Sequence, residues 1–203
     1  MRLSGRVICI GSVLLISLLL SGCLGVSGLW TGANLVYDRH AFLKKMSDYQ
    51  LVAQASRMLY RDKVFKRADC SIDLAALNGD LLLAGHVGTL ALREEAYARV
   101  AREGGFRRLF NQLAIGYSEN GTVEDAWITM KIRSQITADS NLDPHQFKVI
   151  TSDRVVYLMG DVFPDAAARV IDIARRTKGV LRVVKLYKYY SLSDQPQLNE
   201  RKA

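Results

Sequence analysis

The sequence predicts an α+β protein with two tandem αββαβ domains, each a three-stranded mixed sheet packed on two helices. A helical apolar stripe occurs twice, displaced by 77 residues: Leu51, Ala55 and Leu59, then Ile128, Ile132 and Ile136. Two glycines placed at the ends of elements recur with a displacement of 75 residues: Gly85 and Gly104, then Gly160 and Gly179. An internal repeat of this kind indicates two similar folding units, which we place at residues 46–117 and 118–190.

The N-terminal residues 1–22 have the composition of a secretory signal. Arg2 and Arg6 precede an apolar run over residues 7–20, and a small-residue cleavage site follows. The run is 14 residues long, whereas a transmembrane helix needs about 20. We therefore expect a signal peptide and not a membrane span.

The signal ends in Leu20-Ser21-Gly22-Cys23, which resembles the lipobox of bacterial lipoproteins. The resemblance implies cleavage before Cys23 and acylation of that cysteine with palmitate-type chains, which together form a stable anchor. Leu24 follows, and not the aspartate typical of inner-membrane retention. The resemblance therefore implies the periplasmic face of the outer membrane.

The first domain follows a tether over residues 23–45, which is predicted from the glycine and serine density near its start. Ser47 and Gln50 form a capping-box pattern that predicts a helix over 48–61. Asn78-Gly79 between two strand-like runs is a strong hairpin signal. The expected elements that follow are a strand over 70–74, a strand over 81–87, a helix over 89–103 capped by Thr89, and a strand over 107–115.

The second domain repeats this order. Asp153-Arg154 stands where the first domain has Asn78-Gly79, so we expect its turn to differ in type or length. Residues 191–203 are polar and are expected to form a disordered tail. The expected elements are a helix from Thr122, strands over 147–151 and 155–162, a helix from Pro164 and a strand over 180–190.

Composition and motifs argue against catalysis. The net charge of +8 fits an acidic partner such as an anionic lipid surface, or simply a soluble basic protein.

Outside the signal and Cys23, Cys70 is the remaining cysteine, so no intramolecular disulfide is expected in the mature chain. The sequence contains no phosphate-binding glycine loop, nucleophile elbow or HExxH motif, and its histidines are not spaced as metal ligands. We therefore expect a non-enzymatic protein without a metal or cofactor.

Each half resembles the BON domain, a bacterial periplasmic module with a glycine at the end of its second strand. The resemblance is carried by residues 125–135, residues 158–162 and Gly179-Val180, and by Tyr37-Asp38-Arg39 in the tether. A lipobox followed by two such domains is similar to the dual-BON outer-membrane lipoproteins. That resemblance implies phospholipid binding in the second domain and a role in envelope integrity, with cell division among the associated processes.

The candidate lipid-binding residues lie on the helix that begins at Thr122: Trp127, Met130, Lys131, Arg133 and Ser134. Trp127 lies about 100° around the helix from Ile128, outside the core stripe. Tryptophan suits a membrane interface, and the two cations could reach phosphates. The alternative is that Trp127 packs against a neighbouring element, such as the first domain.

Two functions follow from these observations. The first is a lipid-anchored module that binds anionic phospholipid through its second domain. The alternative is a periplasmic interaction or structural module that docks on an envelope protein or on cell-wall machinery. Nucleic acid is not an expected partner, because the signal directs the chain out of the cytoplasm.

Overall fold

The computed structural model describes residues 34–118 and 122–191. The chain divides into two compact units, residues 1–42 and residues 43–203, and both sheets belong to the second. The expected signal peptide, Cys23 and the tail beyond residue 191 lie outside the described residues. The architecture is α+β with two mixed sheets, as the sequence predicts.

The first helix is longer than the sequence predicted. Helix α2 spans Asn34–Leu59, whereas the prediction began at residue 48, so residues 34–45 of the expected tether are helical. This segment contains neither glycine nor proline, the two residues that most disfavour a helix interior. Once a helix has nucleated, each further residue adds a hydrogen bond at little cost. Ser47 therefore lies inside α2 and does not cap it.

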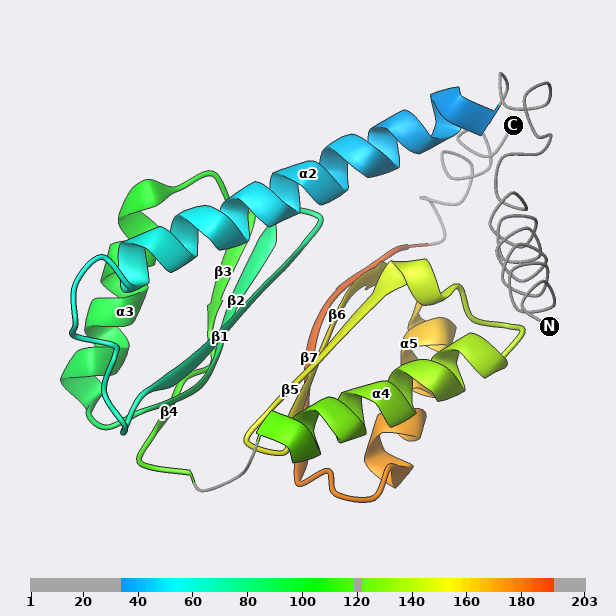
Figure 1. Cartoon of the computed structure of the whole chain (residues 1–203). Helices are drawn as coiled ribbons and strands as arrows, with labels where there is room; N and C mark the ends of the chain where they lie inside the picture. Colours follow the sequence, from blue (N-terminus) through cyan, green and yellow to red (C-terminus); the bar gives the residue numbers. More distant parts are fainter. Residues whose placement is uncertain (1–33, 119–121, 192–203) are drawn as a thin grey trace, which may run out of the picture. The chain divides into compact units, whose positions relative to one another are not determined.

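In the first half, α2 and α3 lie on one face of the sheet (Figure 1). Strand β1 is antiparallel to β2, and β3 and β4 are both parallel to it. The strand expected over 107–115 is interrupted at Gln112-Leu113, where the Asn111 Oδ1 atom accepts a hydrogen bond of 3.3 Å from the Leu113 N–H group. Its elements are β1 Ser71–Leu77, β2 Asp80–Val87, α3 Leu90–Glu103, β3 Arg108–Asn111 and β4 Ala114–Ile115.

The second half has the same order without that interruption. Strand β5 pairs antiparallel with β6, and β7 pairs parallel with β6 along its whole length. A short 3-10 helix, η2, fills the insertion before β5. The elements are α4 Thr122–Ala138, η2 Pro144–Gln146, β5 Phe147–Ser152, β6 Val155–Val162, α5 Pro164–Arg176 and β7 Arg182–Tyr189.

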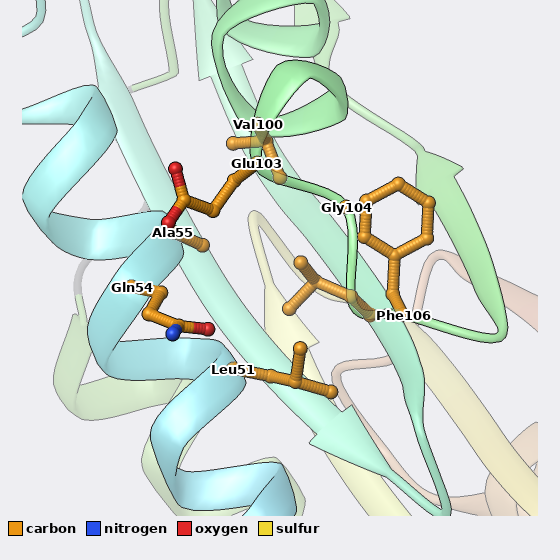
Figure 2. Close-up of a pocket in the computed structure, with 8 residues that line it drawn as sticks. Leu51, Gln54, Ala55, Val100, Glu103, Gly104 and Phe106 are labelled. Carbon is orange, nitrogen blue, oxygen red and sulfur yellow. The ribbon is translucent and has the colours of Figure 1, made fainter.

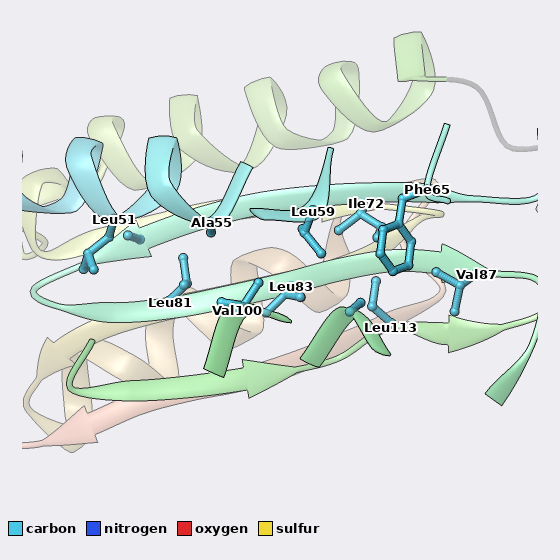
Figure 3. Packing of buried hydrophobic residues seen from close by; sticks show 12 residues of the cluster. Leu51, Ala55, Leu59, Phe65, Ile72, Leu81, Leu83, Val87, Val100 and Leu113 are labelled. Atoms are coloured by element: carbon cyan, nitrogen blue, oxygen red, sulfur yellow. The ribbon is translucent and has the colours of Figure 1, made fainter. Parts of the chain in front are cut away.

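The central strand of the first half is buried along its whole length. Leu81 and Leu83 point to the helices, where they meet Leu51, Ala55 and Val100 (Figure 3). Because successive strand residues point to opposite faces, Leu82 and Ala84 point away from the helices. They belong to a third cluster together with residues of the second sheet: Tyr157, Met159 and Leu186. The two sheets therefore share a core through their helix-free faces.

Ion pairs and hydrogen bonds surround this shared core. The Arg107 guanidinium lies 2.7 Å from carboxylate oxygens of both Asp80 in β2 and Asp161 in β6. The His86 Nδ1 atom lies 2.7 Å from an Asp153 carboxylate oxygen. Polar and charged side chains thus connect the two halves at the edge of the apolar contact.

A buried aspartate on the first helix of each half holds the hairpin turn. The Asp48 carboxylate accepts hydrogen bonds of 2.8 Å from the backbone N–H groups of Asn78 and Gly79. In the second half, the Asp125 carboxylate accepts hydrogen bonds of 2.9 and 2.8 Å from the N–H groups of Asp153 and Arg154. In each half, the same kind of contact therefore joins the first helix to the hairpin.

The two turns have the same length and type, so the predicted difference between them is wrong. Both hairpins have two-residue turns. Positive φ values occur at both central residues, 51° and 82° at Asn78 and Gly79, and 52° and 60° at Asp153 and Arg154. Arginine rarely adopts this conformation, and the Asp125 carboxylate stabilises it by accepting both N–H groups.

The repeated glycines Gly85 and Gly160 permit close backbone approach. A Cβ on Gly85 would lie 2.1 Å from the Ser71 carbonyl oxygen, and one on Gly160 would lie 2.7 Å from the Gln146 carbonyl oxygen. Both contacts are to backbone of the neighbouring segment, which cannot move aside as a flexible side chain can. The two glycines therefore allow the backbone of each hairpin to pack closely against the neighbouring segment.

The turn contacts predict unequal costs for two matched substitutions. Asp125→Ala should lower the free energy of unfolding by about 1–3 kcal/mol, because it removes both acceptors from the turn amides. Asp48→Ala should cost less, since Asn78-Gly79 adopts the turn without help. Urea unfolding followed by circular dichroism measures both. Equal losses would show that the strained Asp153-Arg154 turn does not depend on Asp125.

Acid should weaken the contact around Asp80. Burial raises the pKa of Asp80, but hydrogen bonds and charges from Arg107 and Arg108 outweigh burial and leave the pKa below its usual value. The stabilisation is therefore complete above the unfolded-state pKa of about 3.9 and is lost as the pH falls below it. Asp80→Asn should flatten this part of the plot of unfolding free energy against pH. An unchanged slope would contradict the assignment.

Candidate functional site

Helix α4 exposes an apolar strip on the side away from its core. Its buried face consists of Asp125, Ile128, Ile132 and Ile136. On the opposite side, Val123, Trp127 and Met130 are 82%, 57% and 50% exposed. Their spacing of four and three residues places them on one line along the helix. We call Val123, Trp127 and Met130 the α4 strip.

More than half of the Trp127 surface is exposed, so the described part of the first half does not cover it. Val123 was not among the residues predicted from sequence. Its position four residues before Trp127 was the available signal, because such pairs are neighbours on a helix surface. Ser134, which was predicted, is exposed and continues the line of the α4 strip by one turn.

The two predicted cations flank the α4 strip on opposite sides. At about 100° per residue, Lys131 lies about 40° to one side of Trp127 and Arg133 about 60° beyond Met130. The Lys131 ammonium lies 5.7 Å from the centroid of the Trp127 ring and donates a hydrogen bond of 3.0 Å to the Lys178 carbonyl. Arg133 is exposed. The α4 strip is therefore an apolar surface with a positively charged residue on each side.

The corresponding positions of the first half have a different chemistry. With the displacement of 77 residues, Trp127 corresponds to Gln50 and Met130 to Ala53. Lys131 corresponds to Gln54, which carries no charge. The repeated scaffold therefore presents an exposed tryptophan with adjacent cations on α4 and not on α2.

The first half contains a small pocket of about 10 Å³ between α2, α3 and the sheet (Figure 2). Sites for small organic ligands are usually larger, roughly 300–1,000 Å³. Most of the side chains that line it are apolar members of the first core, and Gln54 and Glu103 stand at its polar side. It thus has neither the volume nor the positive charge of a phospholipid headgroup site.

The described residues contain no group of three or more His, Cys, Asp or Glu side chains that could hold a metal ion. His86 pairs with Asp153, and His145 lies in η2, so the structure does not bring these histidines together as ligands. Cys70 is a half-buried free thiol next to β1. None of the helices within the described part of the chain is long and apolar enough to cross a membrane.

Comparison with known proteins agrees with this architecture. The family model described as BON domain matches residues 124–189, which contain nearly all of the second half. The 21 kDa hemolysin of Actinobacillus pleuropneumoniae is 30% identical over 147 residues, covering 71% of this chain and 75% of that protein. The outer membrane lipoprotein DolP of Haemophilus influenzae is 25% identical over 177 residues, covering 85% of this chain and 91% of DolP.

Among solved structures, one match is CdsD, a structural protein of the type III secretion system of Chlamydia trachomatis. It is 10% identical, covers 75% of this chain and 98% of CdsD, and has a TM-score of 0.30, so it adds nothing to the assignment. The two relatives and the family model, together with the repeated αββαβ order, identify the chain. It belongs to the family of BON-domain outer-membrane lipoproteins.

Proposed function

We propose that this protein is a lipid-anchored, non-enzymatic module that binds anionic phospholipid through α4 and supports the integrity of the envelope. Acylated Cys23 would hold it at the periplasmic face of the outer membrane. The observation that carries the proposal is the α4 strip, with Lys131 and Arg133 on its two sides. The relative named as an outer membrane lipoprotein supports the location.

The chemistry of the α4 strip suits a lipid headgroup layer. The Trp127 ring has an apolar body and a polar edge, which favours the boundary between acyl chains and headgroups. Each lysine or arginine close to an anionic surface adds about 1 kcal/mol of attraction. The covalent anchor would raise the effective concentration of lipid, so even a weak contact would be occupied.

A soluble form can test the proposal without the anchor. Every residue of the three buried clusters lies between Leu51 and Tyr187. Residues 24–203 therefore retain the complete core and should fold without the signal and Cys23. Binding of this form to vesicles reports on the protein surface alone.

Trp127→Glu should abolish binding of residues 24–203 to vesicles of equal parts phosphatidylglycerol and phosphatidylcholine. The substitution removes the ring and adds a charge that the anionic surface repels. Co-sedimentation with the vesicles measures the bound fraction, and circular dichroism confirms that the variant is folded. Binding as tight as that of the parent would contradict the site.

Tyr49→Glu is the matched control, because Tyr49 is an aromatic residue on α2 that is 74% exposed. It should bind like the parent. Vesicles of phosphatidylcholine alone should bind the parent more weakly, since they offer no net negative charge. Equal binding to both vesicle types would contradict the role of Lys131 and Arg133. A protein that co-purifies after all lipid is removed would favour the interaction module instead.

A further inference from the structure

An exposed leucine lies in the α5–β7 connection, which contacts α4 through the residues just before it. Leu181 immediately precedes β7 and is 65% exposed. Its backbone N–H donates a hydrogen bond of 2.9 Å to the Arg154 carbonyl oxygen. Lys178, near it in the chain, is also exposed, whereas the Arg182 side chain interacts with the Tyr157 hydroxyl. The α5–β7 connection therefore presents an apolar side chain near one exposed cation.

Specific contacts hold this connection alongside α4. The Gln135 amide donates to the Thr177 hydroxyl at 3.3 Å, and the Lys131 ammonium donates to the Lys178 carbonyl at 3.0 Å. Gly179 follows with φ of 103°, and a Cβ added there would lie 3.1 Å from Ile128 Cδ1. Three successive residues of the connection thus lie against three successive turns of the helix.

Arg154 fixes the end of the connection. Its Nε atom donates a hydrogen bond of 2.9 Å to the Gly179 carbonyl, and its guanidinium lies 3.5 Å from Glu124 on the first turn of α4. The backbone carbonyl of Arg154 accepts the hydrogen bond from the Leu181 N–H group. The exposed leucine is therefore attached to the scaffold of α4 and cannot swing freely as a loop tip would.

A second membrane contact on another segment would restrict the orientation of the second half at the membrane. A helix that touches a membrane along the α4 strip alone can still roll about its own axis. A second apolar contact beside the helix fixes that rotation, and a nearby cation fits a phosphate in the same layer.

We propose that residues 178–182 form a second membrane contact, in which Leu181 enters the headgroup boundary beside the α4 strip and sets the orientation of the second half. The exposed Lys178 would meet a lipid phosphate near it. This proposal rests on the proposed function of α4 and adds a second segment to it.

Leu181→Asp should lower the partition coefficient of residues 24–203 into the same mixed vesicles roughly tenfold, because the buried leucine surface is lost. The matched control is Leu90→Asp, since Leu90 is 52% exposed on α3 of the first half. The control should partition like the parent. If Leu181→Asp partitions like the parent while Trp127→Glu does not bind, the second contact is wrong and the α4 site stands. If neither variant is impaired, the proposed function itself fails.

Depth measurement provides an independent readout. Trp30→Phe and Trp127→Phe remove both tryptophans of the chain, and Leu181→Trp then supplies a single fluorophore. Lipids with brominated acyl chains should quench its emission in saturating mixed vesicles. The same background with Leu90→Trp should stay unquenched. Equal quenching at both positions, or none at position 181, would overturn the second contact.

Discussion

The carboxylate of Asp125 is the contact on which the geometry of the second half depends. It accepts two N–H groups of the Asp153-Arg154 turn and so joins α4 to the β5–β6 hairpin. Burial raises the pKa of Asp125, and this effect outweighs the two backbone hydrogen bonds, which lower the pKa. Once the turn is held, Arg154 reaches the Gly179 carbonyl and Glu124. One buried carboxylate thereby places the helix, the hairpin and the α5–β7 connection relative to one another, and the α4 strip gains a rigid support.

Much of the fold followed from the sequence, because the repeat made each half a check on the other. The Thr89 cap and the Asn78-Gly79 turn are local signals, and both were predicted correctly. The Asp153-Arg154 turn was not, since its positive φ values depend on a carboxylate 28 residues earlier in the chain. The shared core of the two sheets was also missed, although the uninterrupted apolar run of β2 is typical of a strand buried on both faces.

The residues of the candidate site were chosen from helix periodicity, and their role stays a prediction. Helix periodicity separates the buried Ile128 from Trp127, but it cannot tell an exposed tryptophan from one covered by another element. The exposed fraction of Trp127 in the structure makes that distinction, and the exposure of Val123 adds this residue to the α4 strip. Leu181 has no periodic signal, because it lies between a helix and a strand and is held by backbone contacts. A covalent anchor at Cys23 would make extra affinity unnecessary for attachment, so contacts by the second half would serve orientation and the choice of lipid.

Amide NMR spectra of residues 24–203 titrated with phosphatidylglycerol micelles test the central claim most directly, because every backbone N–H reports separately. We expect the largest shift changes on residues 122–135 and 178–182, with β1, β2 and α3 nearly unaffected. Changes of similar size in both halves, or changes centred on α2, would contradict a lipid surface built on α4.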